Sequence, residues 1–404
     1  MRYDTWEMPD LELPLLHDHH SHVSLYAALD GCPDISQLDK ARAMLLLKSL
    51  PEDRLSTVLG WYSAHLSFTD DELAGLPPVL IVNYSLHGLL LSAGARELLK
   101  DSDPELVERH GDVEWCERNL AALLAVYVRS AGLTREKLGR FMKKLEGLGI
   151  GSTEDMVVTG EEPLKVIRSS PFSGRIRCWA DPATYRFSPG VRKDVVGLKF
   201  FLDGALGLRT AAMKGPGTGG GGKGLLLNTE EELLDKLESV ARLGLPTAIH
   251  ALGGRAIEQV LTCLETLDRE KAPSPRARLE HVQFIDEGQA RRAKKLGLTL
   301  SMQPNFSADS RDYSDRLTPE ARAANNPFRM LIDRAGFVPG ADLVFGSDGM
   351  PHGVHVALRW GLFPDHEGQR LTVPELEAGF GPALGGGGAC RFSVDEAQRR
   401  VELV

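Results

Sequence analysis

Short β-rich runs alternate with helical stretches along the sequence from about residue 145 onward. Strand, helix and strand repeating at intervals of roughly 25 to 35 residues predict parallel βα units. Adding "LELPLLHDHH" near the N-terminus as a first strand gives eight strands, the number in a (β/α)8 TIM barrel. The other seven runs are "GSTEDMVV" (151–158), "RIRCWA" (175–180), "VVGLKFFLDG" (195–204), "PTAIHALGG" (246–254), "RARLEHVQF" (276–284), "LTLSMQP" (298–304) and "DLVFGSD" (342–348).

Amphipathic helices are expected between several of these runs. One is "TEEELLDKLESVARLG" (229–244), with Thr229 as its N-cap and Gly244 just past its end. Another is "DEGQARRAKKLG" (286–297). We therefore expect an α/β fold in which residues 1–404 form one TIM-barrel domain, with residues 371–404 as a short C-terminal extension.

The segment from about 35 to 145 interrupts this alternation. It holds helical pieces such as "LDKARAMLLLKSL" and "NLAALLAVYVRSAGL", and one apolar run, "PPVLIVNYS". We interpret it as a mostly helical insertion after the first barrel strand, placed as a lid over the active face. In the alternative, "PPVLIVNYS" is itself a barrel strand and "RIRCWA" is peripheral; periodicity does not decide between the two.

Charge, cysteine content and the absence of long apolar runs indicate which binding partners and which cellular location to expect. The net charge of -9 offers no basic surplus to neutralise nucleic-acid phosphates. The five cysteines are far apart and form no CxxC pair, and the N-terminal residues lack a secretory pattern. No apolar run is long enough to span a membrane. We expect a cytoplasmic protein with a small-molecule substrate, no nucleic-acid or membrane partner, and a homodimer as the candidate assembly.

A glycine-rich stretch, "GPGTGGGGKG" (215–224), nearly matches the phosphate-binding pattern GxxxxGK[ST]. Gly224 stands where the hydroxyl residue for magnesium would be, and the stretch does not follow a strand directly. We expect a flexible loop here rather than a nucleotide site.

Four histidines crowd into "LHDHHSH" (16–22). On a strand, residues i and i+2 point the same way, so His20 and His22 can bind one metal ion from one face. His17 and His19 are then incidental or supporting, and Asp18 supports the pair. The alternative for two such histidines is a pair of hydrogen-bonded core side chains.

Other polar residues fall at or near the C-terminal ends of predicted strands: Lys199, His250, His281 and Asp348. In TIM barrels these ends form the active face. Each residue alone has a structural explanation, such as a helix cap or an ion pair. Because all four fall at the same end of the predicted barrel as His20 and His22, we expect the six residues to form one metal site. Imidazoles suit zinc, a carboxylate both binds metal and moves protons, and a buried lysine yields a neutral amine that can take up CO2 as a carbamate.

These residues resemble the metal centre of the amidohydrolase superfamily. The short sequence motifs around them resemble those of amidohydrolase family 3, the YtcJ-like branch that includes N-substituted formamide deformylases. The most specific match is "KFFLDGALGLRTA" (199–211). The others are "IHALGGRAI" (249–257), "RLEH" (278–281), "SMQP" (301–304), "PFRMLIDRAG" (327–336) and "GSD" (346–348).

The resemblance implies a two-metal centre, with zinc the preferred metal. His20, His22 and Asp348 would hold one ion, His250 and His281 the other, and carboxylated Lys199 would bridge them. Asp348 would be the catalytic general base and acid. The resemblance also offers substrate-binding or supporting candidates, namely His87 in "SLHG", Asp203, Arg209 and Arg255.

The implied activity is metal-dependent hydrolysis of a C–N bond in an amide, N-acyl or formamide-type substrate. Alternatives are hydrolysis of a lactone, cyclic amide or ester by the same centre, or a metal-binding homologue without turnover. Three departures bear on the substrate. The small β-sandwich of the family is expected to be absent or rudimentary, Gly254 replaces an acid, and "GSDGMPHG" adds His352 and His355 near the site.

Overall fold

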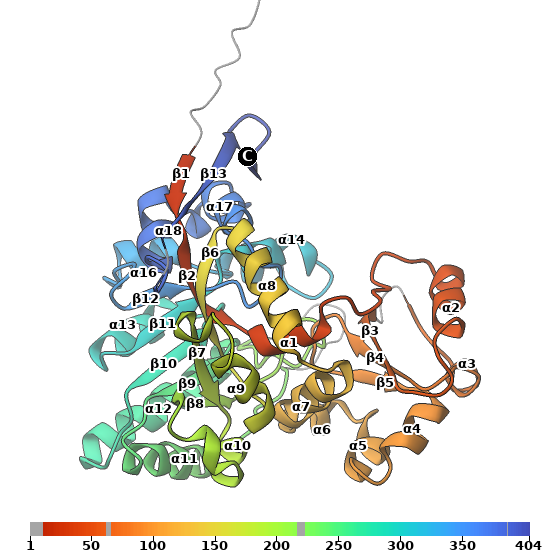
Figure 1. The fold of residues 1–404 in the computed structure, drawn as a ribbon. Helices are drawn as coiled ribbons and strands as arrows, with labels where there is room; N and C mark the ends of the chain where they lie inside the picture. The colour runs from red at the N-terminus through yellow and green to blue at the C-terminus, as the bar shows by residue number, and fades with distance from the viewer. Residues whose placement is uncertain (1–10, 62–65, 216–222, 386) are drawn as a thin grey trace, which may run out of the picture.

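The computed structural model of the chain describes residues 11–61, 66–215, 223–385 and 387–404. Its centre is a sheet of eight parallel strands in the order β12-β11-β10-β9-β8-β7-β6-β2 (Figure 1). The strands are β2 (Leu16–Ser21), β6 (Ile150–Asp155), β7 (Ile176–Ala180), β8 (Val195–Phe201), β9 (Thr247–Ala251), β10 (Ala277–His281), β11 (Thr299–Met302) and β12 (Leu343–Phe345). The predicted (β/α)8 barrel is confirmed. "RIRCWA" supplies barrel strand β7, whereas "PPVLIVNYS" lies outside the barrel.

The first and last strands meet through a close backbone approach. A Cβ atom on Gly346, just after β12, would lie 2.4 Å from the backbone nitrogen of His20 on β2. Only glycine therefore allows this contact. Asp18 completes the junction, because its Oδ1 accepts hydrogen bonds from the backbone nitrogens of His20 and Ser347, both at 3.0 Å. The barrel thus closes at the residues predicted to bind metal.

Helices cover the outside of the barrel, and their ends follow local sequence signals. In α11 (Glu230–Arg242), Thr229 and Glu232 form a reciprocal capping box, and Leu233, Leu237 and Val240 form the buried stripe. Asp286 caps α13 (Glu287–Lys295) in the same way. The other covering helices are α8 (Arg135–Gly147), α9 (Glu161–Arg168), α10 (Pro182–Phe187), α12 (Gly254–Glu270), α16 (Phe328–Asp333), α17 (Val354–Leu362) and α18 (Val373–Phe380).

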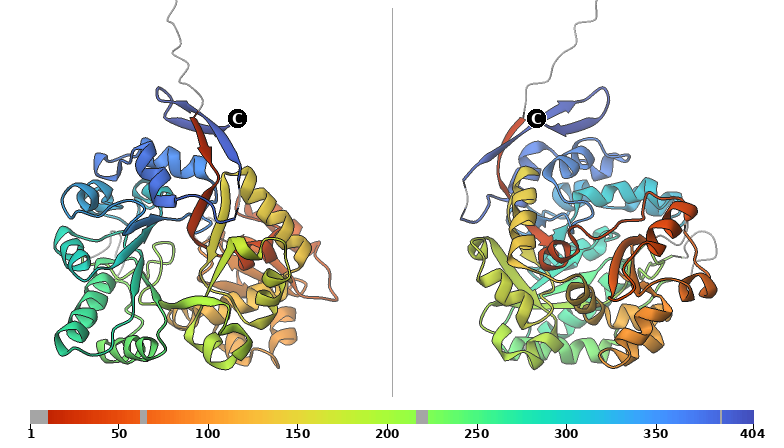
Figure 2. Two further views of the ribbon diagram at one scale, coloured as in Figure 1. Left: turned by 60° about the vertical axis from the view of Figure 1, so that its left-hand side comes forward. Right: turned by 45° about the vertical axis from the view of Figure 1, so that its right-hand side comes forward.

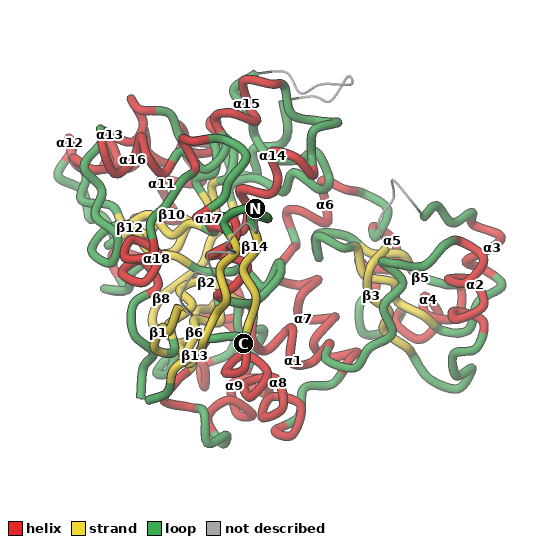
Figure 3. The backbone as a smooth tube through the Cα atoms, turned by 90° about the horizontal axis from the view of Figure 1, so that it is seen from above, coloured by secondary structure: helices red, strands yellow, loops and turns green. Residues whose placement is uncertain are grey.

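The insertion lies to one side of the barrel, as the view from above shows (Figure 3). After α1 (Val23–Leu29) it consists mostly of helices: α2 (Lys40–Lys48), α3 (Asp70–Ala74), α4 (Ala93–Leu99), α5 (Pro104–Arg109), α6 (Val113–Arg118) and α7 (Leu120–Ala131). It also contains a small sheet that the sequence did not predict, in the order β3-β4-β5. "PPVLIVNYS" contributes its middle strand, β4 (Val79–Asn83), between β3 (Ser56–Trp61) and β5 (Leu89–Leu91).

The two ends of the described chain pair in a separate small sheet (Figure 2). β1 (Leu11–Pro14) pairs antiparallel with β13 (Ala389–Asp395), which pairs antiparallel with β14 (Arg400–Leu403). "LELPLLHDHH" therefore makes two strands, not one, and only the second belongs to the barrel. This three-stranded sheet is the rudimentary flanking sheet expected from the sequence.

Most of the glycine-rich stretch, residues 216–222, lies outside the described residues, so the expected flexible loop stays a prediction. Among the described residues, no helix combines the length and apolarity needed to cross a membrane.

Candidate metal centre

Three predicted ligands converge where the barrel closes. Oδ1 of Asp348 lies 3.6 Å from Nε2 of His20 and 3.3 Å from Nε2 of His22. His20 is on β2 and His22 is the N-cap of α1, so both rings reach Asp348 from one segment. The backbone nitrogen of Asp348 donates a 2.6 Å hydrogen bond to the carbonyl oxygen of His20. These atoms form a group with the spacing of metal ligands.

His250 and His281 form a second pair beside the first. Their ring centroids are 4.5 Å apart, and the His281 ring is 4.7 Å from that of His20. Nδ1 of His281 donates to Oε1 of Gln303 at 2.8 Å, which leaves its Nε2 available. Nε2 of His250 donates to the carbonyl oxygen of Gly204 at 3.2 Å, which leaves its Nδ1 available. Each ring thus has one nitrogen fixed by a neighbour, as metal-binding histidines usually do.

Lys199 is enclosed between these groups. Only 1% of the residue is exposed, and its Nζ has no hydrogen-bond partner among the described residues. Burial lowers the pKa of Lys199 to about 8, with Arg278 adding to this effect while Glu280 and Asp348 oppose it. A buried amine without a partner is costly unless a ligand or modification completes it.

The backbone at two of these residues is strained. His281 has φ of 69° and Asp348 has φ of 56°, both in the left-handed region that non-glycine residues rarely adopt. Such conformations persist where the surrounding structure holds them, and they concentrate at functional sites. His281 is the last residue of β10, and Asp348 lies just after β12.

The charges of the site favour an anionic Asp348 beside neutral rings of His20 and His281. Burial alone would raise the pKa of Asp348, but His20, His22 and His281 hold it far below its usual range. Burial, reinforced by Lys199, lowers the pKa of His20 to about 4. Burial and the neighbouring His250 also lower the pKa of His281 well below its ordinary value. Neutral rings around one carboxylate are the protonation state that a metal site needs.

Glu280 was not among the site residues predicted from the sequence. It orients the ring of His20. Nδ1 of His20 donates to Oε2 of Glu280 at 2.6 Å, and Nε of Arg278 donates to Oε1 at 2.6 Å. Burial would raise the pKa of Glu280, but Arg278 and His20 hold it well below its ordinary value. Nε2 of His20 is therefore the nitrogen left for a metal. In the sequence, Arg278-x-Glu280 has the pattern of a solvent-facing strand edge, so no local signal marks Glu280.

The six predicted ligands line one small cavity of about 50 Å³, which His87 also lines. A larger neighbouring cavity of about 520 Å³ shares His87, His250, His281 and Asp348 with it. The aromatic side chains of Tyr84, Phe306, Tyr313 and Trp360 form part of its wall. The structure thus brings all six candidate ligands together at the base of a cavity large enough for a small organic molecule.

His87 is held by the insertion. Its Nδ1 donates to Oε2 of Glu117 at 2.7 Å, and the hydroxyl of Thr210 donates to Oε1 of Glu117 at 2.5 Å. Burial opposes the charged form, but Glu117 raises the pKa of His87 above its ordinary value. Glu117 could not be identified from the sequence, since it lies on α6, far from any strand end.

Three other substrate-binding candidates do not line either cavity. Both carboxylate oxygens of Asp203 accept backbone N–H groups, from Leu252, Gly253 and Ala212, so this residue fixes the loop after β9. Arg209 pairs with Asp315, and Arg255 donates to the carbonyl oxygen of Lys223.

His352 and His355 are not among the residues that line the two cavities. His352 contacts the ring of Tyr26, and its Nε2 is 2.9 Å from Oγ of Ser21. Burial lowers the pKa of His352 to about 3, so the ring is neutral.

Comparison with known proteins finds relatives of this chain among curated proteins. Two curated relatives match parts of the chain: YtcJ of Bacillus subtilis (strain 168), named as an amidohydrolase, is 29% identical over 217 residues, and the LONG AFTER FAR-RED 3 protein of Arabidopsis thaliana is 27% identical over 176 residues. The matches cover 50% and 40% of this chain, but only 40% and 29% of the relatives.

Two solved structures share the fold. They are titled uncharacterized metal-dependent hydrolases, from Pyrococcus horikoshii OT3 and Pyrococcus furiosus, and both have a TM-score of 0.65. Their sequence identities are 24% and 22%, over 87% and 91% of this chain and 74% and 80% of theirs. The family described as "Amidohydrolase family" matches residues 8–356, so the chain belongs to the amidohydrolase family.

Proposed function

We propose that this protein is a metal-dependent hydrolase that cleaves a C–N bond in an amide, N-acyl or formamide-type small molecule. The observation that carries the proposal is the single small cavity lined by His20, His22, Lys199, His250, His281 and Asp348. Its position at the C-terminal ends of the barrel strands, beneath a larger cavity, is where TIM-barrel enzymes place their chemistry. Membership of the amidohydrolase family supports the reaction class.

The residues present fit two divalent ions, with zinc preferred. Two ligands bound about 2.1 Å from a tetrahedral ion lie about 3.4 Å apart. Asp348 lies 3.3 Å and 3.6 Å from the two histidine nitrogens, so this group needs little movement to hold one ion. The second ion would use His250, His281 and Lys199. A carboxylated Lys199 would satisfy the buried Nζ, because the amine nitrogen bonds to the carbon of CO2 and releases a proton, giving an anionic ligand for both ions.

Divalent ions held here would lower the pKa of water and polarise a carbonyl group. Asp348 would accept the proton from the attacking water and pass it to the departing nitrogen, which is a poor leaving group without a proton. The low pKa of Asp348 keeps its carboxyl group ionised, which is the form that can accept a proton. Nε2 of His87, whose Nδ1 is held by Glu117, would donate a hydrogen bond to the substrate.

The test is an activity screen of the full chain against a panel of N-formyl and N-acyl amines, with matched esters and lactones. We expect hydrolysis of at least one amide, loss of that activity after chelation, and recovery on adding Zn²⁺. Hydrolysis of esters or lactones alone would contradict the C–N assignment, and activity unaffected by complete metal removal would contradict the metal mechanism.

A further inference from the structure

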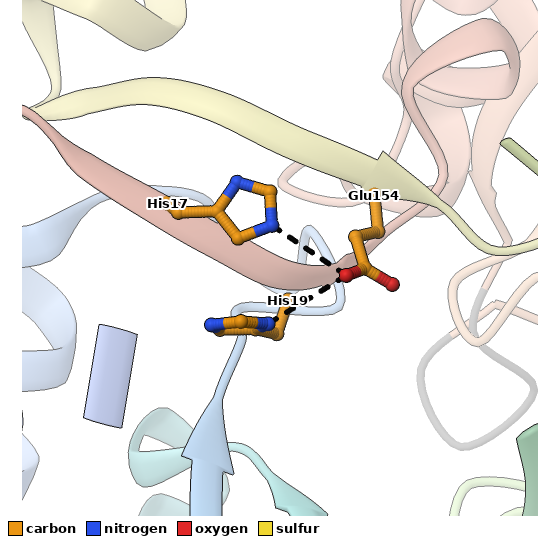
Figure 4. Close-up of side chains that lie close together, drawn as sticks. All are labelled: His17, His19 and Glu154. Carbon is orange, nitrogen blue, oxygen red and sulfur yellow. Dashed lines mark ion pairs between the residues drawn. The ribbon is translucent and has the colours of Figure 1, made fainter. Parts of the chain in front are cut away.

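Two histidines of the cluster at 16–22 face a glutamate on the neighbouring strand (Figure 4). His17 and His19 come from β2 and Glu154 from β6. Oε1 of Glu154 lies 3.5 Å from Nε2 of His17 and 3.6 Å from Nδ1 of His19. The three ligand atoms all lie within 4.8 Å of one another. None of the three residues lines the cavities of the candidate centre.

We propose that His17, His19 and Glu154 form a separate metal site, the β2–β6 site, for a divalent ion that prefers imidazole ligands, such as Zn²⁺. Two imidazoles and one carboxylate are a ligand set that zinc accepts, and they leave one position for water. The site is independent of the hydrolase proposal, because it shares no residue with the candidate centre.

The spacing of the ligand atoms supports this site. Ligands about 2.1 Å from a tetrahedral ion lie about 3.4 Å apart. Distances of 3.5 Å and 3.6 Å from Glu154 are close to that value, and they match the 3.3 Å and 3.6 Å from Asp348 in the candidate centre. Neither histidine is at normal hydrogen-bonding distance from Glu154, since charge-assisted N–H···O bonds are near 2.8 Å. The carboxylate therefore sits at a spacing typical of shared metal ligands.

The hydrogen bonds around His17 leave its Nε2 without a partner. Nδ1 of His17 is 2.7 Å from Oγ of Ser152, which also accepts the backbone N–H of Leu384. With Nδ1 engaged by Ser152, Nε2 is the ring nitrogen that faces the carboxylate of Glu154. The residue is 4% exposed, and Nε2 has no hydrogen-bond partner among the described residues. A cation between Nε2 and the carboxylate of Glu154 would give this buried nitrogen a partner.

Hydrogen bonds around Glu154 leave one of its carboxylate oxygens available to bind a metal ion. Oε2 accepts the indole N–H of Trp179 at 2.6 Å and a guanidinium N–H of Arg278 at 3.0 Å, which leaves Oε1 for the histidines. Burial would raise the pKa of Glu154, but Arg278 and the two imidazoles hold it well below its ordinary value. Supporting hydrogen bonds of this kind orient carboxylates that bind metals.

One group competes with an ion at this position. NH1 of Arg177 lies 3.7 Å from Oε1 of Glu154, but 48% of that side chain is exposed. It can therefore move into solvent when an ion binds. An ion here would link β2 to β6. Its ligand Glu154 is also connected to His20 of the candidate centre by hydrogen bonds through Arg278 and Glu280.

The test counts Zn²⁺ bound by the full chain. Protein freed of metal with a chelator is titrated with Zn²⁺, and bound metal is measured by elemental analysis after removal of free ions. We compare the wild type with His19→Gln, since His19 is partly exposed and tolerates the change, and with His110→Gln as a control for a half-buried histidine elsewhere. Circular dichroism and thermal unfolding verify that each variant is folded.

We expect His19→Gln to bind one Zn²⁺ per chain fewer than the wild type, and His110→Gln to bind as many as the wild type. Arg177→Gln removes the competing charge and should lower the free Zn²⁺ needed for half-saturation of that one equivalent by about fivefold. Equal Zn²⁺ content in wild type and His19→Gln would overturn the β2–β6 site. If the hydrolase centre were wrong instead, the wild type would bind only the one ion that His19→Gln loses.

Discussion

The backbone nitrogen of Asp348 donates a 2.6 Å hydrogen bond to the carbonyl oxygen of His20, although the two residues are 328 positions apart. This bond joins the loop after the last barrel strand to the first barrel strand. It places a carboxylate beside two imidazoles as a direct consequence of barrel closure, aided by the close approach of Gly346 to His20. The candidate metal centre therefore depends on the complete ring of eight strands.

Asp348→Asn should remove the proton acceptor while preserving the fold. Asparagine tolerates the left-handed backbone that residue 348 adopts, at φ of 56°. We expect kcat to fall by at least about a hundredfold, because an amide cannot relay a proton. Steady-state kinetics and thermal unfolding measure the two effects. The matched control is Asp312→Asn, a cavity-lining carboxylate that contacts no predicted ligand. Turnover retained by Asp348→Asn would refute the proton-transfer role.

Glu280→Gln should weaken metal binding without touching a predicted ligand. The change removes the charge that orients His20 through its Nδ1, and it leaves Arg278 with one buried anion fewer. Loss of such a supporting group costs about tenfold to a hundredfold in metal affinity. Zn²⁺ titration of metal-free protein measures this loss. Glu287→Gln, which breaks a surface ion pair with Arg291, should leave the affinity unchanged. An equal affinity in both variants would show that Glu280 has no part in the centre.

His87→Gln should affect substrate more than metal. The ring is held by Glu117 and lines both cavities. We expect kcat/KM to fall by about tenfold to a hundredfold with metal content unchanged, since a positioned hydrogen bond to substrate is lost. Kinetics together with elemental analysis separate the two effects, and His110→Gln provides the comparison. A loss of metal in His87→Gln would instead assign His87 to the metal centre.

Asp309 should make the stability of the protein depend on pH. Burial raises its pKa to about 7, with Asp312 adding to the effect and a hydrogen bond from Gln283 opposing it. The folded state thus binds this proton more tightly than the unfolded state, so stability falls as pH rises from about 4 to about 7. Asp309→Asn should become more stable relative to the wild type over that window, by about 1–2 kcal/mol after allowing for partial exposure.

Denaturant unfolding of both proteins at pH 4.5, 6 and 8 measures that difference. Asp312→Asn is again the comparison, since it removes only the neighbouring charge and should change the stability less. A difference between wild type and Asp309→Asn that stays constant with pH would show that Asp309 titrates normally.

The sequence could predict the barrel because most strands are short apolar runs between helices, some of which, such as α11 and α13, have clear caps. It could predict that His20, His22, Lys199, His250, His281 and Asp348 meet, since residues at the C-terminal ends of parallel strands face one end of the barrel. The structure places all six around one cavity. Their roles as ligands stay predictions until metal binding is measured.

Some features of the site and fold depend on contacts between residues far apart in the sequence, and these could not be predicted from local patterns. Arg278-x-Glu280 resembles the solvent face of a strand, yet both side chains are turned inward toward Glu154 and His20. Glu117 reaches His87 only because the insertion folds against the barrel. Asp203 looked like a substrate contact, but three backbone N–H groups occupy its oxygens. The sequence predicts one strand where the structure has β1 and β2. The partner of β1, β13, comes from the far end of the chain, so local patterns do not separate the two.

The most direct test of the metal centre is anomalous X-ray scattering from crystals of the Zn²⁺-loaded full chain, recorded at the zinc absorption edge. We predict two anomalous peaks in the cavity, one among His20, His22 and Asp348 and one beside His250 and His281, with additional electron density on Nζ of Lys199. Peaks at the β2–β6 site are counted separately and do not bear on this test. A cavity with no anomalous peak beside either group would contradict the proposed centre.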